Sequence, residues 1–139
     1  MKDRIFVDSN VWIYLFKSDD IEKNIIVKRF FSKNSNNENM FIVSYQVINE
    51  VVSVLKQKKG LNENQLQFFI ETMLELAEVQ NFSKKMIFAA SELRKDYAVS
   101  YWDSLIVSAA ISAECKYVIT EDMQHNQNIK GTIIKNIFK

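Results

Sequence analysis

The sequence of 139 residues contains no proline, two glycines, one cysteine and one histidine. Nucleotide-binding loops of the Gly-x-Gly-x-x-Gly and Walker types need several glycines, so this scarcity excludes most dinucleotide- and ATP-binding folds. Cys115 has no second cysteine for an internal disulfide, and with a single histidine it cannot supply the Cys and His ligands of a zinc site. Any metal ion that this chain binds must therefore be held by oxygen.

Long apolar runs and an excess of one charge are also missing. No stretch approaches the ~20 apolar residues that cross a membrane, and the N-terminal Met1 to Arg4 leads into a short apolar run that Asp8 interrupts, unlike a secretory signal. We therefore expect a cytoplasmic protein without membrane contact. The net charge of +1 lacks the basic excess of many nucleic-acid-binding proteins, but it allows local basic patches.

What is present is typical of a soluble globular protein. Hydrophobic residues make up 47% of the chain and charged residues 25%. The length predicts one domain over residues 1–139, large enough to bury around two-thirds of its unfolded surface. No internal repeat, low-complexity segment or linker is visible.

Short apolar runs alternate with longer amphipathic segments. The predicted strands are 4–8, 40–43, 78–80, 116–120 and 132–135. The predicted helices begin near residue 10, at 19–20, and after the cap residues Ser44, Asn62, Ser83 and Ser100, with Ser9 and Asn10 as caps of the first. Polar loops are expected at 32–39 and 123–130. This alternation predicts a parallel sheet with helices on both faces.

The segment from Ser100 to Ala110 is an apolar helix with one acid near its start. Ser100 and Asp103 have the spacing of a capping box, in which a carboxylate is stabilised by free N–H groups. Trp102 would share the packed face of this helix with Ile106 and Ala109. Taken alone, Asp103 is best interpreted as a capping residue.

Three further acids are expected near the same edge of the sheet. Asp8 and Asp122 each follow a predicted strand, and the ligand crevice of a parallel sheet lies beyond the carboxyl ends of its strands. Asp103 reaches this edge if the connection before its helix carries it there. Glu50 lies roughly 9 Å along its helix from the cap and reaches the edge by leaning back; a lone glutamate there would ordinarily be a surface residue.

Four carboxylates close together repel one another and raise each other's pKa unless a cation lies among them. Mg²⁺ or Mn²⁺ takes oxygen ligands and commonly binds through carboxylates together with substrate phosphate. Such a site polarises a phosphoryl group and activates water. The four acids therefore predict phosphodiester hydrolysis.

Four segments resemble, in order and spacing, the acidic motifs of PIN-domain ribonucleases, and among these the VapC-type toxins. The segments are Phe6–Asn10, Asn49–Val51, Tyr101–Ile106 and Thr120–Gln124. The resemblance covers nearly the whole chain. It implies a three-layer α/β/α fold with a five-stranded parallel sheet of order 3-2-1-4-5.

By the same resemblance, the catalytic and metal-binding acids are Asp8, Glu50, Asp103 and Asp122, with Asn10 and Thr120 as polar supports. The implied activity is that of a Mg²⁺- or Mn²⁺-dependent endoribonuclease, the toxin of a type II toxin–antitoxin pair. The implied partners are an RNA substrate such as tRNA, a cognate antitoxin and a second copy of the chain in a homodimer. The chain departs from the family at Asn126, where a glycine is usual, and at Ile137, where a proline is common; we expect these changes to affect loop shape and substrate contacts.

Basic residues offer candidate substrate contacts. Lys56, Lys58, Lys59 and His125 are the weakest of the site predictions, because lysines at a helix end are ordinarily solvated. His125 is interpreted as a loop histidine that contacts phosphate or solvent and not as a proton carrier, because the metal ion already supplies the nucleophile. Lys84, Lys85, Arg94 and Lys95 are further candidates.

Rival functions remain at this point. A receiver-like phosphoacceptor module is disfavoured, because Asp8 is followed by Ser9 and Asn10 and because Val43 is followed by Ser44 instead of an acceptor aspartate. A nuclease of RNA maturation or DNA processing, and a catalytically silent PIN-fold binding module, stay open.

Overall fold

The structure is a computed structural model that describes residues 3–35 and 39–139. Two of the predictions extend beyond these residues. Met1 and Lys2 of the N-terminal stretch, and residues 36–38 of the predicted polar loop at 32–39, lie outside the described part of the chain.

The described residues form a six-stranded sheet of order β3-β2-β1-β4-β6-β5. The strands are β1 (Arg4–Val7), β2 (Met40–Ser44), β3 (Ala77–Gln80), β4 (Tyr117–Ile119), β5 (Asn128–Ile129) and β6 (Thr132–Lys135). Each of the pairs β3–β2, β2–β1, β1–β4 and β4–β6 is parallel. The predicted order of five parallel strands is therefore present, with β6 as its fifth member.

The prediction of a five-stranded, purely parallel sheet is wrong at one edge. The two-residue strand β5 pairs antiparallel with β6 and lies where the sequence predicted a polar loop. Lys130 and Gly131 join the two strands, and both have positive φ, 51° and 94°. A two-residue hairpin turn of this kind needs positive φ at both positions. Because Lys rarely takes that conformation, the turn has little signature in the sequence.

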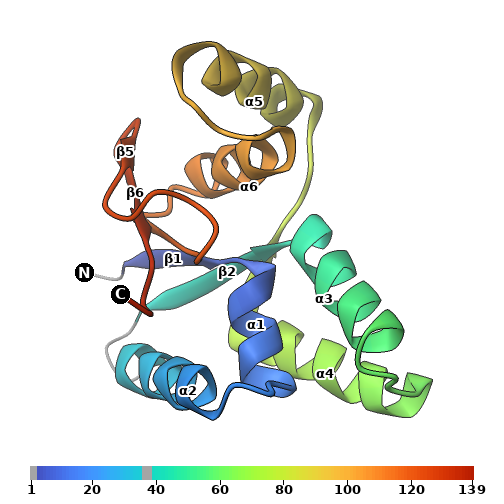
Figure 1. Cartoon of the computed structure of the whole chain (residues 1–139). Helices are drawn as coiled ribbons and strands as arrows, with labels where there is room; N and C mark the ends of the chain where they lie inside the picture. Colours follow the sequence, from blue (N-terminus) through green and yellow to red (C-terminus); the bar gives the residue numbers. More distant parts are fainter. Residues whose placement is uncertain (1–2, 36–38) are drawn as a thin grey trace.

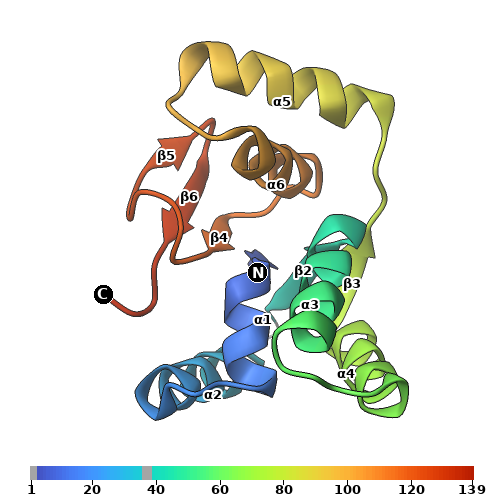
Figure 2. The ribbon, with the colours of Figure 1, turned by 45° about the vertical axis from the view of Figure 1, so that its right-hand side comes forward.

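Helices cover both faces of the sheet (Figure 1 and Figure 2). They are α1 (Ser9–Phe16), α2 (Ile21–Ser35), α3 (Tyr45–Gln57), α4 (Glu63–Leu76), α5 (Lys84–Asp96) and α6 (Tyr101–Ser112). The α5–α6 pair lies on one side of the sheet, and α1 to α4 lie on the other. The three layers of the predicted fold are thus confirmed. No helix in the described part of the chain has the length and apolar character needed to cross a membrane.

The helix starts agree with the sequence except at α1. Ser44, Asn62, Ser83 and Ser100 each cap a helix with the side chain, and Asn62 forms a full capping box with Gln65. The cap of α1 is Asp8, whose carboxylate accepts the Ser9 N–H, in place of the predicted Ser9 and Asn10. Helix α2 also continues to Ser35, past the predicted start of the loop at Ser32.

Helix α6 is the most buried helix, but its first turn is not. Every residue from Ser104 to Ala110 is buried, because the helix packs against α5 and also contacts β2, β4 and β6. Trp102 was predicted on this packed face, and that prediction is wrong: its side chain is 64% exposed. The first turn projects beyond the contacts that bury the rest of the helix.

Asn126 occupies the position where the resemblance led us to expect glycine. Its φ is 67°, a left-handed conformation that asparagine tolerates better than most residues. Its N–H donates to the Ile134 carbonyl, and its side chain accepts from the Lys135 ammonium at 2.6 Å. The loop therefore keeps a turn of the kind that glycine would form.

Candidate active site

Asp8 lies directly after β1, the strand beside β4 in the middle of the sheet. It is 4% exposed, and its N–H donates to the Ile119 carbonyl of β4 at 3.0 Å. Its Oδ1 accepts the Ser9 N–H at 2.7 Å, and its Oδ2 accepts the Thr120 hydroxyl at 2.8 Å. The side chain is therefore fixed in place by the first residue of α1 and by the residue that follows β4.

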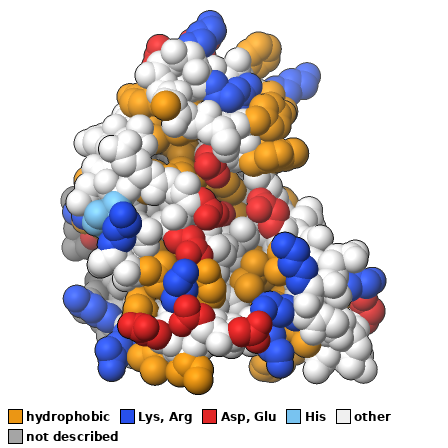
Figure 3. Space-filling model, viewed as in Figure 1, with side chains coloured by type: hydrophobic (Ala, Val, Ile, Leu, Met, Phe, Trp, Pro, Cys, Tyr) orange, Lys and Arg blue, Asp and Glu red, His pale blue; other side chains and the backbone are white. Residues whose placement is uncertain are grey.

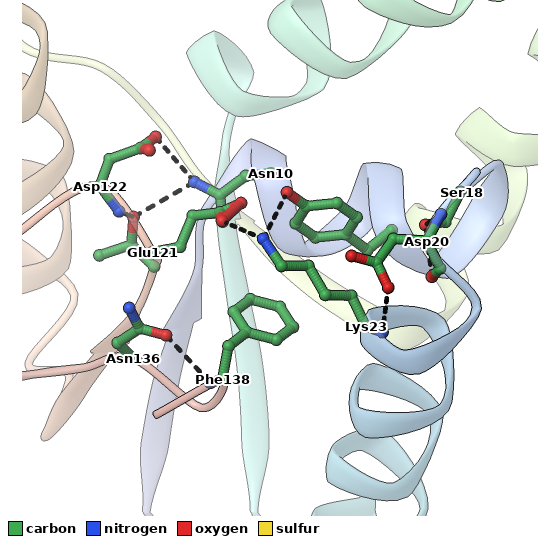
Figure 4. A network of polar contacts seen from close by, with 10 residues as sticks. Asn10, Ser18, Asp20, Lys23, Glu121, Asp122, Asn136 and Phe138 are labelled. Atoms are coloured by element: carbon green, nitrogen blue, oxygen red, sulfur yellow. Dashed lines mark hydrogen bonds and ion pairs between the residues drawn. The ribbon is translucent and has the colours of Figure 1, made fainter.

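Asp122 is joined to Asp8 through Thr120 and Asn10. The Asn10 amide nitrogen donates to Asp122 Oδ2 at 2.9 Å and to the Thr120 hydroxyl at 3.3 Å (Figure 4). The Asp122 N–H also donates to the Thr120 hydroxyl at 3.1 Å. Asn10 and Thr120, predicted as polar supports, thus contact the acids.

Glu50 is brought to the same edge by α3. The Ser9 hydroxyl lies 3.3 Å from Glu50 Oε2 and 3.5 Å from Asp8 Oδ1, so that it links the two acids. The Gln46 amide donates to the other Glu50 oxygen at 3.1 Å. A groove of about 400 Å³ adjoins this carboxylate; its lining comprises Ser9, Gln46, Asn49, Glu50, Ser53 and Val54.

Asp103 occupies the first turn of α6, where its N–H donates to the Ser100 hydroxyl at 3.1 Å. Burial raises the pKa of the Asp103 carboxyl, the contact with Ser100 lowers it, and the charge of Asp122 raises it. The capping interpretation and the site interpretation are therefore both compatible with the geometry: the cap holds a carboxylate that is electrostatically coupled to Asp122.

The acids share one electrostatic environment. Burial raises the pKa of Asp8 to about 6; the hydrogen bonds from Ser9 and Thr120 oppose this, and the charges of Glu50 and Asp122 add to it. Figure 3 shows acidic side chains gathered in a column between the α5–α6 layer and the opposite layer. Four carboxylates that are far apart in sequence are thus coupled by their charges: Asp8 with Glu50 and Asp122, and Asp103 with Asp122.

The oxygen-rich chemistry of this cleft fits a divalent cation. Within residues 3–35 and 39–139, no three His, Cys, Asp or Glu side chains are arranged as a preformed metal site. One buried side-chain oxygen here, Asn10 Oδ1, has no hydrogen-bond partner. Unpaired buried oxygen is costly, and the surrounding carboxylates are the ligands that Mg²⁺ and Mn²⁺ prefer.

Three of the four predicted substrate contacts have partners elsewhere. Lys56 pairs with Glu63 at 2.9 Å and Lys59 with Asp19 at 3.1 Å. Lys58 is exposed at the carboxyl end of α3. His125 Nδ1 accepts the Asn136 N–H at 3.0 Å and borders a different cavity, whose lining includes none of the four acids. The geometry brings none of these four residues into contact with the acids.

Lys23 forms an ion pair with Glu121, the residue before Asp122, and the sequence alone did not indicate this contact. Lys23 of α2 pairs with Glu121 at 2.8 Å and donates to the Tyr14 hydroxyl at 3.2 Å (Figure 4). Its ammonium also lies 5.2 Å from the centre of the Phe138 ring. Hydrogen bonds to Glu121 and Tyr14 raise the pKa of Lys23, so that it stays charged. Since Lys23 and Glu121 are 98 positions apart, no local pattern could have paired them.

Ser9 and Gln46, which hold Glu50, were also missed. The sequence predicts Ser9 as a helix cap, a role that does not account for the contact of its hydroxyl with Glu50. Gln46 precedes Glu50 by four positions, a spacing that places two side chains on the same side of a helix. That spacing is the signal that could have identified Gln46.

Comparisons with known proteins identify the family and the fold. A family model described as PIN domain matches residues 5–128. Among curated proteins, no sequence matches the chain.

Several solved structures share the fold. VapC20 of Mycobacterium tuberculosis, described as a sarcin–ricin-loop-cleaving toxin, is 17% identical with a TM-score of 0.66 and covers 82% of this chain and 86% of its own. VapBC2 of Rickettsia felis, bound to a promoter DNA fragment, is 21% identical with a TM-score of 0.67 and covers 96% and 98%. VapBC-1 of nontypeable Haemophilus influenzae is 17% identical with a TM-score of 0.69 and covers 98% and 99%.

Proposed function

Because the chain belongs to the PIN domain family, we propose that it is a metal-dependent endoribonuclease that hydrolyses phosphodiester bonds of RNA. One observation carries the proposal: Asp8, Glu50 and Asp122, from separate parts of the chain, are joined through Ser9, Thr120 and Asn10, and the charge of Asp122 acts on Asp103 as well. A fold of this kind hosts a ligand at the carboxyl edge of its sheet.

The four acids are the groups that would hold Mg²⁺ or Mn²⁺. When bound, a divalent ion supplies a Lewis acid that polarises the phosphodiester and lowers the pKa of water. The fixed position of Asp8 between Ser9 and Thr120, and of Asp122 beside Asn10, keeps these carboxylates in place without a large loss of side-chain entropy when the ion and substrate arrive.

Lys23 gives the site a second property. An anionic substrate is repelled by every carboxylate that faces it, and Glu121 adjoins Asp122 in sequence. The ion pair with Lys23 directs the Glu121 carboxylate away from Asp122 and compensates its charge (Figure 4). The cleft therefore presents the acids proposed to hold the ion without the additional charge of Glu121.

The groove beside Glu50 suits a polar polymer. Its lining of hydroxyl and amide groups from Ser9, Gln46, Asn49 and Ser53 can accept and donate hydrogen bonds to ribose and base edges. We therefore place part of an RNA strand there. The net charge of the chain is only +1, so general electrostatic attraction contributes little to RNA binding and local contacts must hold the substrate. A structured RNA, with tRNA as one candidate, offers several such contacts.

The biological role that we propose is that of a toxin in a type II toxin–antitoxin pair. The support is the likeness to VapC20 and to two VapBC complexes over nearly the whole chain. A cognate antitoxin would then be the partner, the active form would be a homodimer, and both would act in the cytoplasm. A PIN-fold nuclease of RNA maturation is the second candidate.

Cleavage of RNA tests the proposed activity. We expect the purified protein to cleave structured RNA with Mg²⁺ or Mn²⁺, to stop when a chelator is added, and to lose activity in Asp8→Asn and Asp103→Asn while the circular dichroism spectrum stays unchanged. Asp96→Asn is the matched control, because Asp96 is an exposed acid at the end of α5. An Asp103→Asn variant as active as the wild type would remove Asp103 from the site.

Expression in cells tests the role. We expect the chain alone to arrest growth, and co-expression of a short open reading frame immediately upstream to relieve the arrest. An Asp103→Asn variant that does not arrest growth would link the arrest to the acidic cleft. If neither arrest nor relief occurs and RNA is still cleaved in vitro, the maturation role replaces the toxin role.

A further inference from the structure

Two aromatic side chains stand in solvent at the start of α6. Tyr101 is 53% exposed and Trp102 is 64% exposed. Large aromatic side chains are among those that gain most free energy from burial. The apolar periodicity of α6 predicts Trp102 on the packed face of this helix, so its exposure needs an explanation. An exposed pair in the turn that also carries Asp103 therefore suggests a binding role.

The pair is held in a defined geometry. The two ring centres are 5.1 Å apart with an interplanar angle of 89°, so that the edge of one ring meets the face of the other. The Arg94 guanidinium lies 4.8 Å from the centre of the Tyr101 ring and donates to the Ser104 hydroxyl at 2.6 Å. A positive charge is thus fixed beside the aromatic pair.

A nucleobase has the chemistry that this arrangement recognises. Unpaired bases stack on aromatic side chains regardless of their identity, and an adjacent guanidinium attracts the phosphates between them. Hydrophobic side chains gather over the α5–α6 layer directly beside the acidic column (Figure 3). Because Tyr101, Trp102 and Asp103 share the first turn of α6, a base on this pair would lie at the same end of the helix as the Asp103 carboxylate.

We propose that Tyr101 and Trp102 form a stacking platform for an unpaired nucleobase of the RNA, next to the bond that is cleaved, with Arg94 attracting the adjoining phosphate. This inference rests on the proposed function, because it assigns substrate contacts to that same cleft. A second copy of the chain is a less suitable occupant, since a protein surface seated on Trp102 would lie over the mouth of the cleft beside Asp103.

The tryptophan content provides a direct measurement. The chain has two tryptophans; Trp12 is fully buried and Trp102 is exposed. A ligand that stacks on the surface therefore changes the fluorescence emission of Trp102 and leaves the emission of Trp12 unchanged. We would titrate the wild-type protein, in chelator so that no cleavage occurs, with a single-stranded oligouridylate and with an abasic oligonucleotide of equal length. Anisotropy of a labelled oligonucleotide reports total binding in parallel.

We expect saturable quenching of Trp102 by the oligouridylate and none by the abasic strand. Trp102→Leu keeps an apolar side chain but cannot stack, and it should raise the dissociation constant about 5- to 100-fold. Trp102→Phe should retain most of the affinity. Phe88→Leu is the matched control, because Phe88 is a 75% exposed aromatic residue on α5; it should bind like the wild type.

Unchanged Trp102 emission at saturating RNA, absence of RNA binding, or wild-type affinity in Trp102→Leu would each overturn the platform. So would a Trp102→Leu variant that binds RNA normally but sediments as a monomer where the wild type is a dimer, which would assign the pair to self-association. Cleavage in Mg²⁺ is scored separately: RNA that is cleaved without any Trp102 response refutes the platform alone, and a Trp102 response without cleavage refutes the nuclease alone.

Discussion

Asp8 combines near-complete burial with an ionisable group. A carboxylate loses most of its hydration in such a place, and two hydrogen bonds compensate only part of that loss. The outcome is a pKa of about 6 in the folded protein against 3.8 for an ordinary Asp side chain. This arrangement is unfavourable for stability, but it is suited to binding a cation, because the cation would neutralise the charge that burial penalises.

The pH dependence of folding should reveal this conflict. Between about pH 4 and pH 6 the native protein binds more protons than the unfolded chain, so the free energy of unfolding falls as the pH rises through this window, by about 3 kcal/mol in total. Asp8→Asn removes the titration and should be more stable than the wild type at pH 7.5. Urea unfolding in chelator at pH 4.5, 6 and 7.5 measures both effects. An Asp8→Asn variant with the wild-type pH slope would show that another group titrates.

The candidate acids and two of the groups that contact them, Asn10 and Thr120, could be predicted from the sequence, but the contacts of Ser9, Gln46 and Lys23 could not. Asp8 and Asp122 follow predicted strands, helix geometry made Glu50 and Asp103 candidates for the same edge, and the resemblance to known motifs implied the same four residues. Ser9 and Glu50 are 41 positions apart, and a contact over that separation depends on how α3 packs against α1. Short-range patterns carry no information on such packing, so Ser9 was assigned only as a cap.

Helix starts were predictable because capping is local chemistry. A side chain that accepts an N–H two or three residues later needs no tertiary contact, and Ser44, Asn62, Ser83 and Ser100 were all identified in this way. The face that a helix buries depends on its neighbours. Helix α6 lies between α5 and the sheet, so that every residue from Ser104 to Ala110 is buried. Because this burial does not follow a helical periodicity, the periodicity placed Trp102 on the wrong side of the helix. The β5–β6 hairpin was missed because its turn begins with Lys130 in place of Asn or Asp.

Removing one cap should separate stability from function. Ser100→Ala deletes the acceptor of the Asp103 N–H and should cost about 1 kcal/mol of stability; because the same turn holds the Asp103 carboxylate, RNA cleavage should fall as well. Asn62→Ala deletes the cap of α4, whose partner is Gln65, and should cost a similar amount without loss of activity. Urea unfolding and initial cleavage rates are measured for both. Equal activities in the two variants would show that the Ser100 cap does not position Asp103.

The whole fold is required to assemble the cleft. Asp8 follows β1, Glu50 lies in α3, and Asp103 and Asp122 come from α6 and the segment after β4. The parallel pairing of β2, β1 and β4 directs the chain to the same edge after each of these strands. Lys23 and Asn10 then tie the segment after β4 to the α1–α2 side of the molecule. The unfolded chain has no such site, since its acids are dispersed along more than a hundred residues.

Binding of a divalent ion should therefore stabilise the folded protein. An ion that binds only the native state adds about 2.7 kcal/mol at a hundred times its dissociation constant, which for a chain of this length raises the melting temperature by roughly 5–10 °C. We expect Mn²⁺ or Mg²⁺ to produce this shift at pH 7.5, and Asp103→Asn to reduce it. Glu75→Gln, at an exposed position on α4, should leave it intact. At pH 4.5, with Asp8 protonated, the shift should nearly disappear. Differential scanning fluorimetry at constant ionic strength measures the shift. If the ion raises the melting temperatures of Asp103→Asn and the wild type equally, it binds outside the cleft.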